Sequence, residues 1–373
     1  MSSRRVPDNV DDVDMLWHPR AQSAPVKQPF SSRVLWDMVD GPMPRGLLGV
    51  GSGDVVVTRE ARSLYLGGYS SSFRNRLYVA DGSIDGSLAE ASWRVRTDRR
   101  GRAAALAPDP PRSAWDGGGM HTPSYLPATD THPERIYYAG RSGRRHVGAG
   151  SSYAIGVLER LDGRWRRTSD PLLRGAGGRP SLLEPRVVRD AGRHVMWFLA
   201  APHEVAPGEQ PDYELRCATS ADGVTDWSEP RVFATSTEGF FDVALTRTGE
   251  RWSLILARGR NLHGTRPYPP QGLWAMSAPR LSPDRADWSE PKRILDTDAP
   301  DVPAWMGAGV CDPAAHVDAA GRLTVFVTGT RRRRSWLELA QTRLRRGRRP
   351  PPPAPFFLAT GVLSFDAFTA LVE

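Results

Sequence analysis

The chain has little cysteine, and this excludes two classes of protein. Its 373 residues include 2 cysteines, Cys217 and Cys311. Two are too few for a disulfide framework, and neither lies in a spacing typical of a metal site. We therefore expect both to be free thiols on buried strands.

Long apolar segments are also missing. The first 20 residues contain no apolar stretch of the kind that an export signal carries. No window of the chain approaches the length of a membrane-spanning helix. The sequence predicts a cytoplasmic protein with no membrane partner.

No nucleic-acid-binding motif accompanies the positive charge of the chain. The 50 basic and 42 acidic residues give a formal net charge of +8, which raises the question of nucleic acid. The arginines are scattered, except at 331–334 and 343–349. The sequence therefore favours a solvated, arginine-rich surface and a small-molecule substrate, with no nucleic acid partner. It sets no oligomeric state.

Helical periodicity is absent as well. Apolar residues alternate or run in short blocks, and 36 glycines and 33 prolines interrupt them, which is typical of an all-β protein with many turns. Residues 181–230 hold one complete unit of four short strands. The turn at 190–193 joins its first two strands, and Asp222-Gly223 joins the last two.

Units of this plan recur about every 65 residues. The residues that open them are at spacings of 67, 63, 58 and 70 positions, and they are Asp54, His121, Glu184, Asp242 and Asp312. The pattern predicts a five-bladed β-propeller with four-stranded antiparallel blades, formed by residues 33–373 as a single domain. Residues 1–32 are expected to form an arm or cap. In the fifth unit, residues 336–344 (WLELAQTRL) are expected to continue the sheet as a strand.

Several motifs of these units resemble a known group of enzymes. They are Leu183-Glu184-Pro185, the run 217–223 followed by Trp227, Phe240-Phe241-Asp242 and Cys311-Asp312-Pro313. Over residues 33–345 the chain is similar to the five-bladed glycoside hydrolases of families 43, 62, 32 and 68. The resemblance implies an acid of the first blade as base or nucleophile, a glutamate of the third as proton donor, and an aspartate of the second that tunes the site.

The match to this pattern is incomplete. Glu184 fits the third-blade acid, and Asp54 fits the first, although Asp54 lacks the proline that usually follows there. The second blade has His121 where an aspartate is expected. A histidine can act as a general acid or base, because its ordinary pKa is about 6.5. The catalytic candidates are Glu184, Asp54, His121 and Asp242.

Other residues are candidates for binding. In a propeller, the start of each innermost strand and the loop between the second and third strands lie on the same face of the ring. The candidate substrate-binding residues are Asp312, His263, Arg186, Trp305 and Arg260. Asp312 and His316 lie four apart on a strand and share a face, so they are the candidate ligands of a channel cation such as calcium. No other cofactor is expected.

Three classes of function stay open. The first is a glycosidase that acts on a small glycoside or polyol-type substrate through two carboxyl groups. The second is a lyase, cyclase or isomerase of bacterial specialised metabolism that uses His121 with Glu184 or Asp242. The third is a carbohydrate-binding propeller without catalysis, and fold-level analogy does not separate the three.

Overall fold

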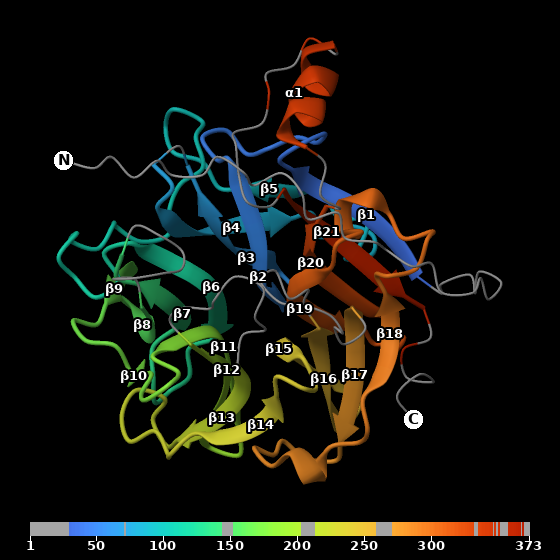
Figure 1. Cartoon of the computed structure of the whole chain (residues 1–373). Coiled ribbons are helices and arrows are strands. Elements are labelled where there is room, and N and C mark those ends of the chain that lie inside the picture. The colour runs from blue at the N-terminus through green and yellow to red at the C-terminus, as the bar shows by residue number, and fades with distance from the viewer. Residues whose placement is uncertain are drawn as a thin grey trace, which may run out of the picture.

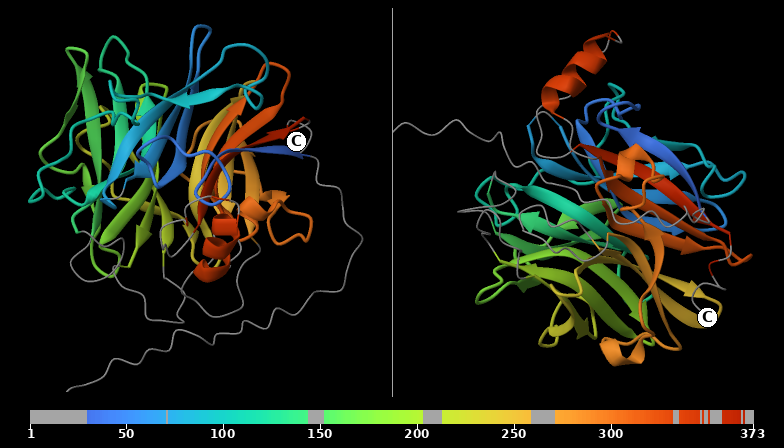
Figure 2. Two further views of the ribbon diagram at one scale, coloured as in Figure 1. Left: turned by 90° about the horizontal axis from the view of Figure 1, so that it is seen from above. Right: turned by 45° about the vertical axis from the view of Figure 1, so that its right-hand side comes forward.

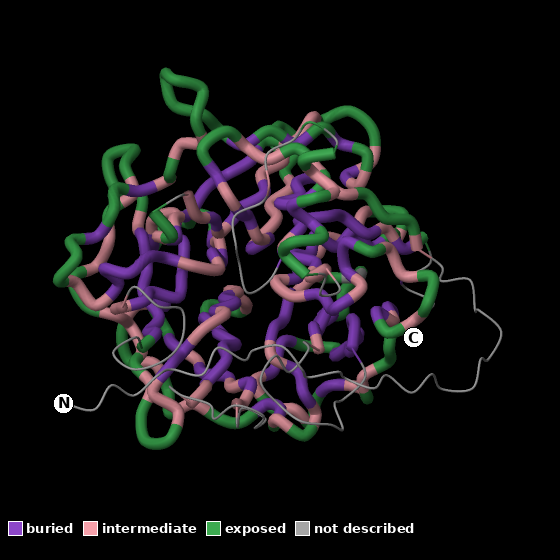
Figure 3. The backbone as a smooth tube through the Cα atoms, turned by 45° about the horizontal axis from the view of Figure 1, so that its top comes forward, coloured by how far each residue is buried: buried purple, intermediate pink, exposed green. Residues whose placement is uncertain are grey.

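The structure is a computed structural model of the chain and is mostly β (Figure 1). It describes residues 30–70, 72–143, 152–202, 213–258, 271–331, 335–345, 347, 350, 357–366 and 368. Within these residues no helix has the length and apolar character that crossing a membrane requires. The sheets lie around a common centre, and their buried strands alternate with exposed loops (Figure 3).

Two four-stranded sheets follow the predicted plan closely. Each is an antiparallel meander in chain order. The first consists of β11 (Ser181–Asp190), β12 (Arg193–Ala201), β13 (Glu214–Ser220) and β14 (Arg231–Thr235). The second consists of β15 (Phe240–Thr248), β16 (Arg251–Arg258), β17 (Gly272–Ala278) and β18 (Lys292–Asp296).

A nine-stranded sheet precedes them in the chain. Its strands are β2 (Gly49–Val57), β3 (Arg62–Tyr69), β4 (Asn75–Gly82), β5 (Trp93–Val95), β6 (Gly119–Leu126), β7 (Arg135–Arg141), β8 (Tyr153–Leu161), β9 (Arg164–Arg167) and β10 (Leu173–Arg174). β2 to β5 form one antiparallel run, and β6 to β10 form another. The two runs are joined by a single parallel pair, Asn75 with Gly119.

The last sheet combines both ends of the described chain. β19 (Val310–Val317), β20 (Leu323–Thr330) and β21 (Leu358–Phe365) form three of its strands, and β1 (Phe30–Asp37) pairs antiparallel with β21. Two short 3₁₀ helices, η1 (Arg285–Asp287) and η2 (Ala304–Met306), lie in connections before this sheet.

The prediction of a strand at 336–344 is wrong, because this segment is the helix α1 (Trp336–Arg345), which projects from the sheets (Figure 2). Ser335 and Glu338 have the spacing of a capping box, and the Glu338 N–H donates to Ser335 Oγ over 3.2 Å. Leu339 packs against Val39 and Phe357. The local capping signal and one buried helix face favour a helix here over the fourth strand expected for the fifth unit.

The predicted turn between β11 and β12 is confirmed. Asp190 pairs with Arg193, and the two residues between them, Ala191 and Gly192, have φ values of 46° and 78°. This is a two-residue turn of the type whose twist matches the flanking strands. The Ala-Gly pair therefore fixes the register of the hairpin.

The first strands of the hairpins surround the centre of the molecule. β2, β6, β11, β15 and β19 contact one another in a closed order, with β19 returning to β2. Each of these strands has a β-bulge in its pairing with the next strand. Bulges re-aim side chains and often lie beside active sites. The bulges of these five strands are therefore the candidate location of a functional site.

Candidate active site

Three of the bulges have a strained backbone. Thr122, Glu184 and Asp312 have φ values of 44°, 53° and 50°, and each is followed by a proline. A left-handed conformation costs a residue with a side chain about 1–3 kcal/mol and clusters at functional sites. By this register Thr122, and not its neighbour His121, occupies the position in β6 that Glu184 and Asp312 occupy in β11 and β19.

Three carboxyl groups meet at the bulges of β11, β15 and β19. One carboxylate oxygen each of Glu184, Asp242 and Asp312 lies within 4.8 Å of the others. The Asp242 side chain is fixed by two backbone amides: Oδ1 accepts from Val243 N over 2.8 Å, and Oδ2 accepts from Asp312 N. Asp242 is buried, whereas Glu184 and Asp312 are partly exposed. Three acids that are distant in the sequence therefore form one cluster.

The cluster holds protons more tightly than ordinary carboxyl groups. Burial raises the pKa of Glu184 well above its usual range, and the charges of Asp312 and Asp242 add to this rise. Burial, followed by the charge of Asp312, also raises the pKa of Asp242 well above its usual range, with Arg186 acting in the opposite direction. The pKa of Asp312 is raised by burial as well. Close carboxyl groups of this kind share protons and titrate as a unit.

Asp54 lies outside this cluster and has its own partners. Its Oδ1 forms an ion pair with Arg186 Nη1 at 2.8 Å and accepts from Val55 N over 2.9 Å, while Oδ2 accepts from Tyr125 N over 2.8 Å. Burial raises the pKa of Asp54, and the charge of Arg186 opposes that rise. The first-strand acid is therefore held by one arginine and two backbone amides.

Arg186 connects four of the central strands. From β11 it donates to the carbonyl oxygens of Val243 (3.1 Å), Pro313 (2.9 Å) and Gly53, in addition to its ion pair with Asp54. Its side chain is 7% exposed. The guanidinium predicted to bind substrate thus lies against protein atoms of β2, β15 and β19.

His121 borders the cluster from β6. Asn75 Nδ2 donates to His121 Nδ1 over 3.0 Å, which places the proton of a neutral ring on Nε2. The ring lies 5.5 Å from that of Tyr153. Burial raises the pKa of Tyr153 to about 12, with Arg141 opposing the rise and the charge of Glu184 adding to it. Glu184 and His121 are therefore neighbours of the same tyrosine.

The remaining candidates lie elsewhere. Trp305 is buried in the core and packs over Gly329 and Gly361. His316 has Asp318 and Arg62 as its charged neighbours, and burial lowers its pKa. The bulge in β19 interrupts the alternation that would put it on the face of Asp312. His263 and Arg260 lie outside the described residues.

The three clustered carboxyls are also the group among the described residues that could hold a metal ion. Carboxylate oxygens are the ligands that calcium and magnesium prefer. His316 is not part of this group, although the sequence paired it with Asp312. A cation at this place would compete with the protons that the cluster holds.

Sequence reasoning missed four residues around the cluster. They are Thr122, Asn75, Tyr153 and Arg141. The dipeptide Thr122-Pro123 repeats the acid-proline dipeptides at 184 and 312, and this signal could have identified Thr122. The other three come from second and third strands, for which the repeat carries no marker.

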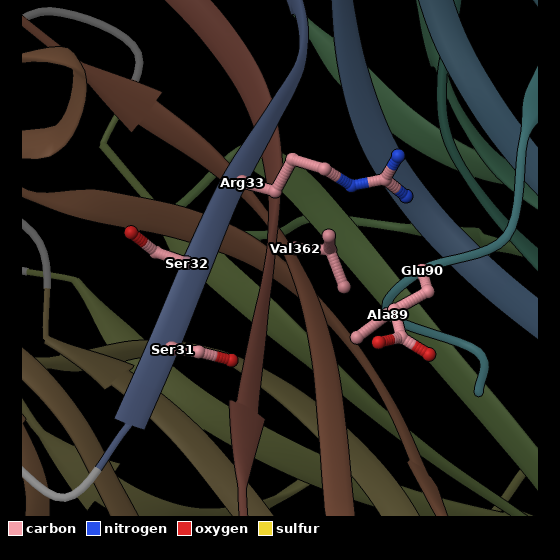
Figure 4. Close-up of a pocket in the computed structure, with 6 residues that line it drawn as sticks. All are labelled: Ser31, Ser32, Arg33, Ala89, Glu90 and Val362. Carbon is pink, nitrogen blue, oxygen red and sulfur yellow. The ribbon is translucent and has the colours of Figure 1, made fainter.

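Two surface cavities lie away from this cluster. One, of about 260 Å³, is lined by Ser31, Ser32, Arg33, Ala89, Glu90 and Val362 (Figure 4). The other, of about 330 Å³, lies beside Arg193, Cys217 and Arg231. Neither is lined by a residue of the carboxyl cluster.

No protein-family model matches this chain, and no curated protein matches it. Among solved structures, it is similar to an α-L-arabinofuranosidase from Lactobacillus brevis, at 12% identity, a TM-score of 0.53 and coverage of 88% of this chain and 91% of that chain.

Two further structures are similar to a comparable extent. An inulosucrase from Halalkalicoccus jeotgali bound to kestose is 14% identical, with a TM-score of 0.53 and coverage of 88% of both chains. A thermostable family-43 glycoside hydrolase is 11% identical, with a TM-score of 0.51 and coverage of 86% and 90%. At these identities the likeness concerns the fold, and at that level the predicted resemblance to propeller glycoside hydrolases is confirmed.

Proposed function

We propose that this protein is a glycoside-hydrolase-like enzyme that acts on a small glycoside through the carboxyl cluster. The observation that carries the proposal is the meeting of Glu184, Asp242 and Asp312 within 4.8 Å, at bulges of the central strands β11, β15 and β19. Glycosidic cleavage needs one protonated and one ionised carboxyl group beside the scissile bond. A cluster that shares protons supplies both forms at neutral pH.

Each acid has a distinct part in this proposal. Glu184, whose pKa is raised by burial and by its two acidic neighbours, donates its proton to the leaving oxygen as the glycosidic C–O bond breaks. Asp312 is partly exposed and is the carboxylate that attacks the anomeric carbon or takes a proton from water. Asp242, buried and held by two amides, keeps Asp312 in place and raises the pKa of Glu184.

The spacing within the cluster favours direct attack. Carboxyl pairs that attack the sugar themselves are about 5–5.5 Å apart, whereas pairs that place a water molecule are about 6.5–9.5 Å apart. One oxygen of each acid lies within 4.8 Å of one oxygen of each of the others, which is nearer the shorter spacing. Proton NMR of the first-formed product distinguishes the two routes, because direct attack retains the anomeric configuration.

We also propose that the ring has five blades. Supporting this count, β2, β6, β11, β15 and β19 contact one another in a closed order. The nine-stranded sheet consists of two antiparallel runs joined by one parallel residue pair. Counted as two blades, these runs complete the ring with the three four-stranded sheets.

The test compares two acids that differ in their partners. On a panel of nitrophenyl glycosides of neutral pentoses and hexoses, Asp312→Asn and Glu184→Gln should each lower kcat about 10²- to 10⁴-fold with little change in Tm. Asp54→Asn is the matched control, and it should lower Tm while leaving most of the activity. Full activity in Glu184→Gln, or loss of activity without loss of Tm in Asp54→Asn, would contradict the assignment.

A second candidate function rests on His121. Asn75 fixes the ring, and the ring and Glu184 share Tyr153 as a neighbour, so a histidine and a carboxyl group are available for proton transfer without hydrolysis. This favours a lyase or isomerase of specialised metabolism. Loss of activity in His121→Gln, together with full activity in Asp312→Asn, would support this candidate against the first.

A further inference from the structure

A buried arginine beside the carboxyl cluster has no acidic partner. Arg141 ends β7, and its side chain has no exposed surface. Nη2 donates to the carbonyl oxygens of Gly118 (3.0 Å) and Phe73 (3.3 Å). Among the described residues, Nε and Nη1 have no hydrogen-bond partner, and no carboxylate lies within ion-pair distance. The guanidinium is thus buried with much of its donor capacity unused.

Other buried arginines of this protein are paired. Arg135, at the opposite end of β7, contacts Glu159 at 2.9 Å, and Arg186 contacts Asp54 at 2.8 Å. Taking a cation out of water costs several kcal/mol unless an opposite charge compensates. Burial lowers the pKa of Arg141, which agrees with an uncompensated cation. A stable fold alone gives no reason for a free charge at this place.

The position of Arg141 relates it to the site. Tyr153 is the residue paired with Arg141 across β7 and β8, and it is close enough to Glu184 for that carboxyl group to raise its pKa. His121 contacts the Tyr153 ring and accepts from Asn75, whose buried Oδ1 has no hydrogen-bond partner among the described residues. Tyr153 therefore relates the cation to the carboxyl cluster, with His121 and then Asn75 beside it.

From this arrangement we infer that Arg141 makes the Glu184 site selective for sugars that carry an anionic group, a carboxylate, phosphate or sulfate. The inference rests on the proposed function and names the substrate class of the same site. The anionic group docks against Tyr153, His121 and Asn75, on the side of the cluster that faces Arg141. In a region of low dielectric constant the field of a buried cation is screened much less than in water. Arg141 is therefore a specificity-determining residue and not a catalytic one.

A binding assay tests the inference without any need for turnover. Thermal shift is measured with D-glucuronate, D-glucose 6-phosphate, D-glucose and inorganic sulfate as separate probes. In the wild-type protein, glucuronate or glucose 6-phosphate should raise Tm at concentrations about 10- to 100-fold lower than glucose does, as expected for a charge-assisted contact. The probe that binds more tightly distinguishes a carboxylate from a phosphate ligand. Equal effects of the anionic sugars and glucose, or of the anionic sugars and sulfate, would overturn the inference.

Variants locate the effect. Arg141→Met should abolish the preference for the anionic sugars, and Arg141→Lys, which keeps the charge, should retain part of it. Arg135→Met is the matched control from the same strand, and it should lower Tm and leave the preference intact. A preference that survives in folded Arg141→Met protein would refute the inference. If that variant does not fold, the wild-type comparison and Arg141→Lys still decide.

The two proposals can fail separately. Anionic sugars that bind through Arg141 while no glycoside is cleaved would leave the inference in place and contradict the proposed hydrolysis. Cleavage of neutral nitrophenyl glycosides, with no gain for the matching nitrophenyl uronides, would support hydrolysis and refute the selectivity.

Discussion

Arg186 is the residue whose replacement tests most directly how the centre of this fold is held together. Its guanidinium contacts the backbone carbonyls of Gly53, Val243 and Pro313 and the carboxylate of Asp54. Arg186→Met keeps the length and the apolar stem of the side chain and removes every one of these polar contacts. Three buried carbonyl groups and one carboxylate then lose a donor.

The size of the effect follows from these contacts. Removing one partner of a buried ion pair costs about 3–5 kcal/mol, and each carbonyl left without a donor adds to this cost. We expect a total of about 5 kcal/mol. With about 2.1 cal/mol/K of unfolding entropy per residue, a chain of 373 residues should lose about 6 °C of Tm.

The assay is thermal unfolding of four proteins: wild type, Arg186→Met, Asp54→Asn and the double variant. Because the two side chains contact each other, the double variant should be less destabilised than the two single effects added together. Arg186→Lys keeps the charge and should be intermediate, since an ammonium group cannot reach all four partners. The reasoning is refuted if Arg186→Met keeps the wild-type Tm and weakens substrate binding instead, which is the role that the sequence suggested.

Three further predictions concern titration and thiols. The raised pKa of Glu184 means that the folded state keeps a proton that the unfolded state releases above about pH 4.5. Over a buffer series, Tm should therefore fall as pH rises from about 5 to about 8, and it should fall less in Glu184→Gln. His194 shows the opposite dependence, because burial, with His132 and Arg135 nearby, lowers its pKa. Tm should therefore decrease as pH falls below about 6.5, and this decrease should be smaller in His194→Gln. A pH profile of Tm in that variant that equals the wild-type profile would contradict this prediction. Cys217 and Cys311 are both free, so a thiol reagent should label both after denaturation without reduction, and labelling that requires prior reduction would disprove this.

The parts of the fold that could be predicted are those encoded locally. The Ala191-Gly192 turn and the strands beside it depend on residues close in sequence. The acids at 184, 242 and 312 could be identified because each interrupts the first strand of a repeated hairpin. Repetition revealed their common position before any contact between them was known.

What could not be predicted depends on contacts between distant residues. Asp54 matches the other acids in sequence, but Arg186, from a different sheet, pairs with it and separates it from the cluster. The one-residue offset between His121 and Thr122 depends on where the bulge of β6 falls. Arg141 carries no sequence signal, because its unusual property is a missing partner.

The pairing of β1 with β21 has a consequence for how the chain matures. These strands are separated by about 320 residues, so β1 can join the last sheet only after β21, which lies between β1 and β20, has been synthesised. At about 5–20 residues per second, β1 waits on the order of tens of seconds for its partner after leaving the ribosome. During that interval β1 has no strand partner, and unpaired strand edges are sites of aggregation. The pairing of β1 with β21 therefore comes late among the described strands, which makes it a checkpoint between a closed last sheet and a substrate for chaperones or proteases.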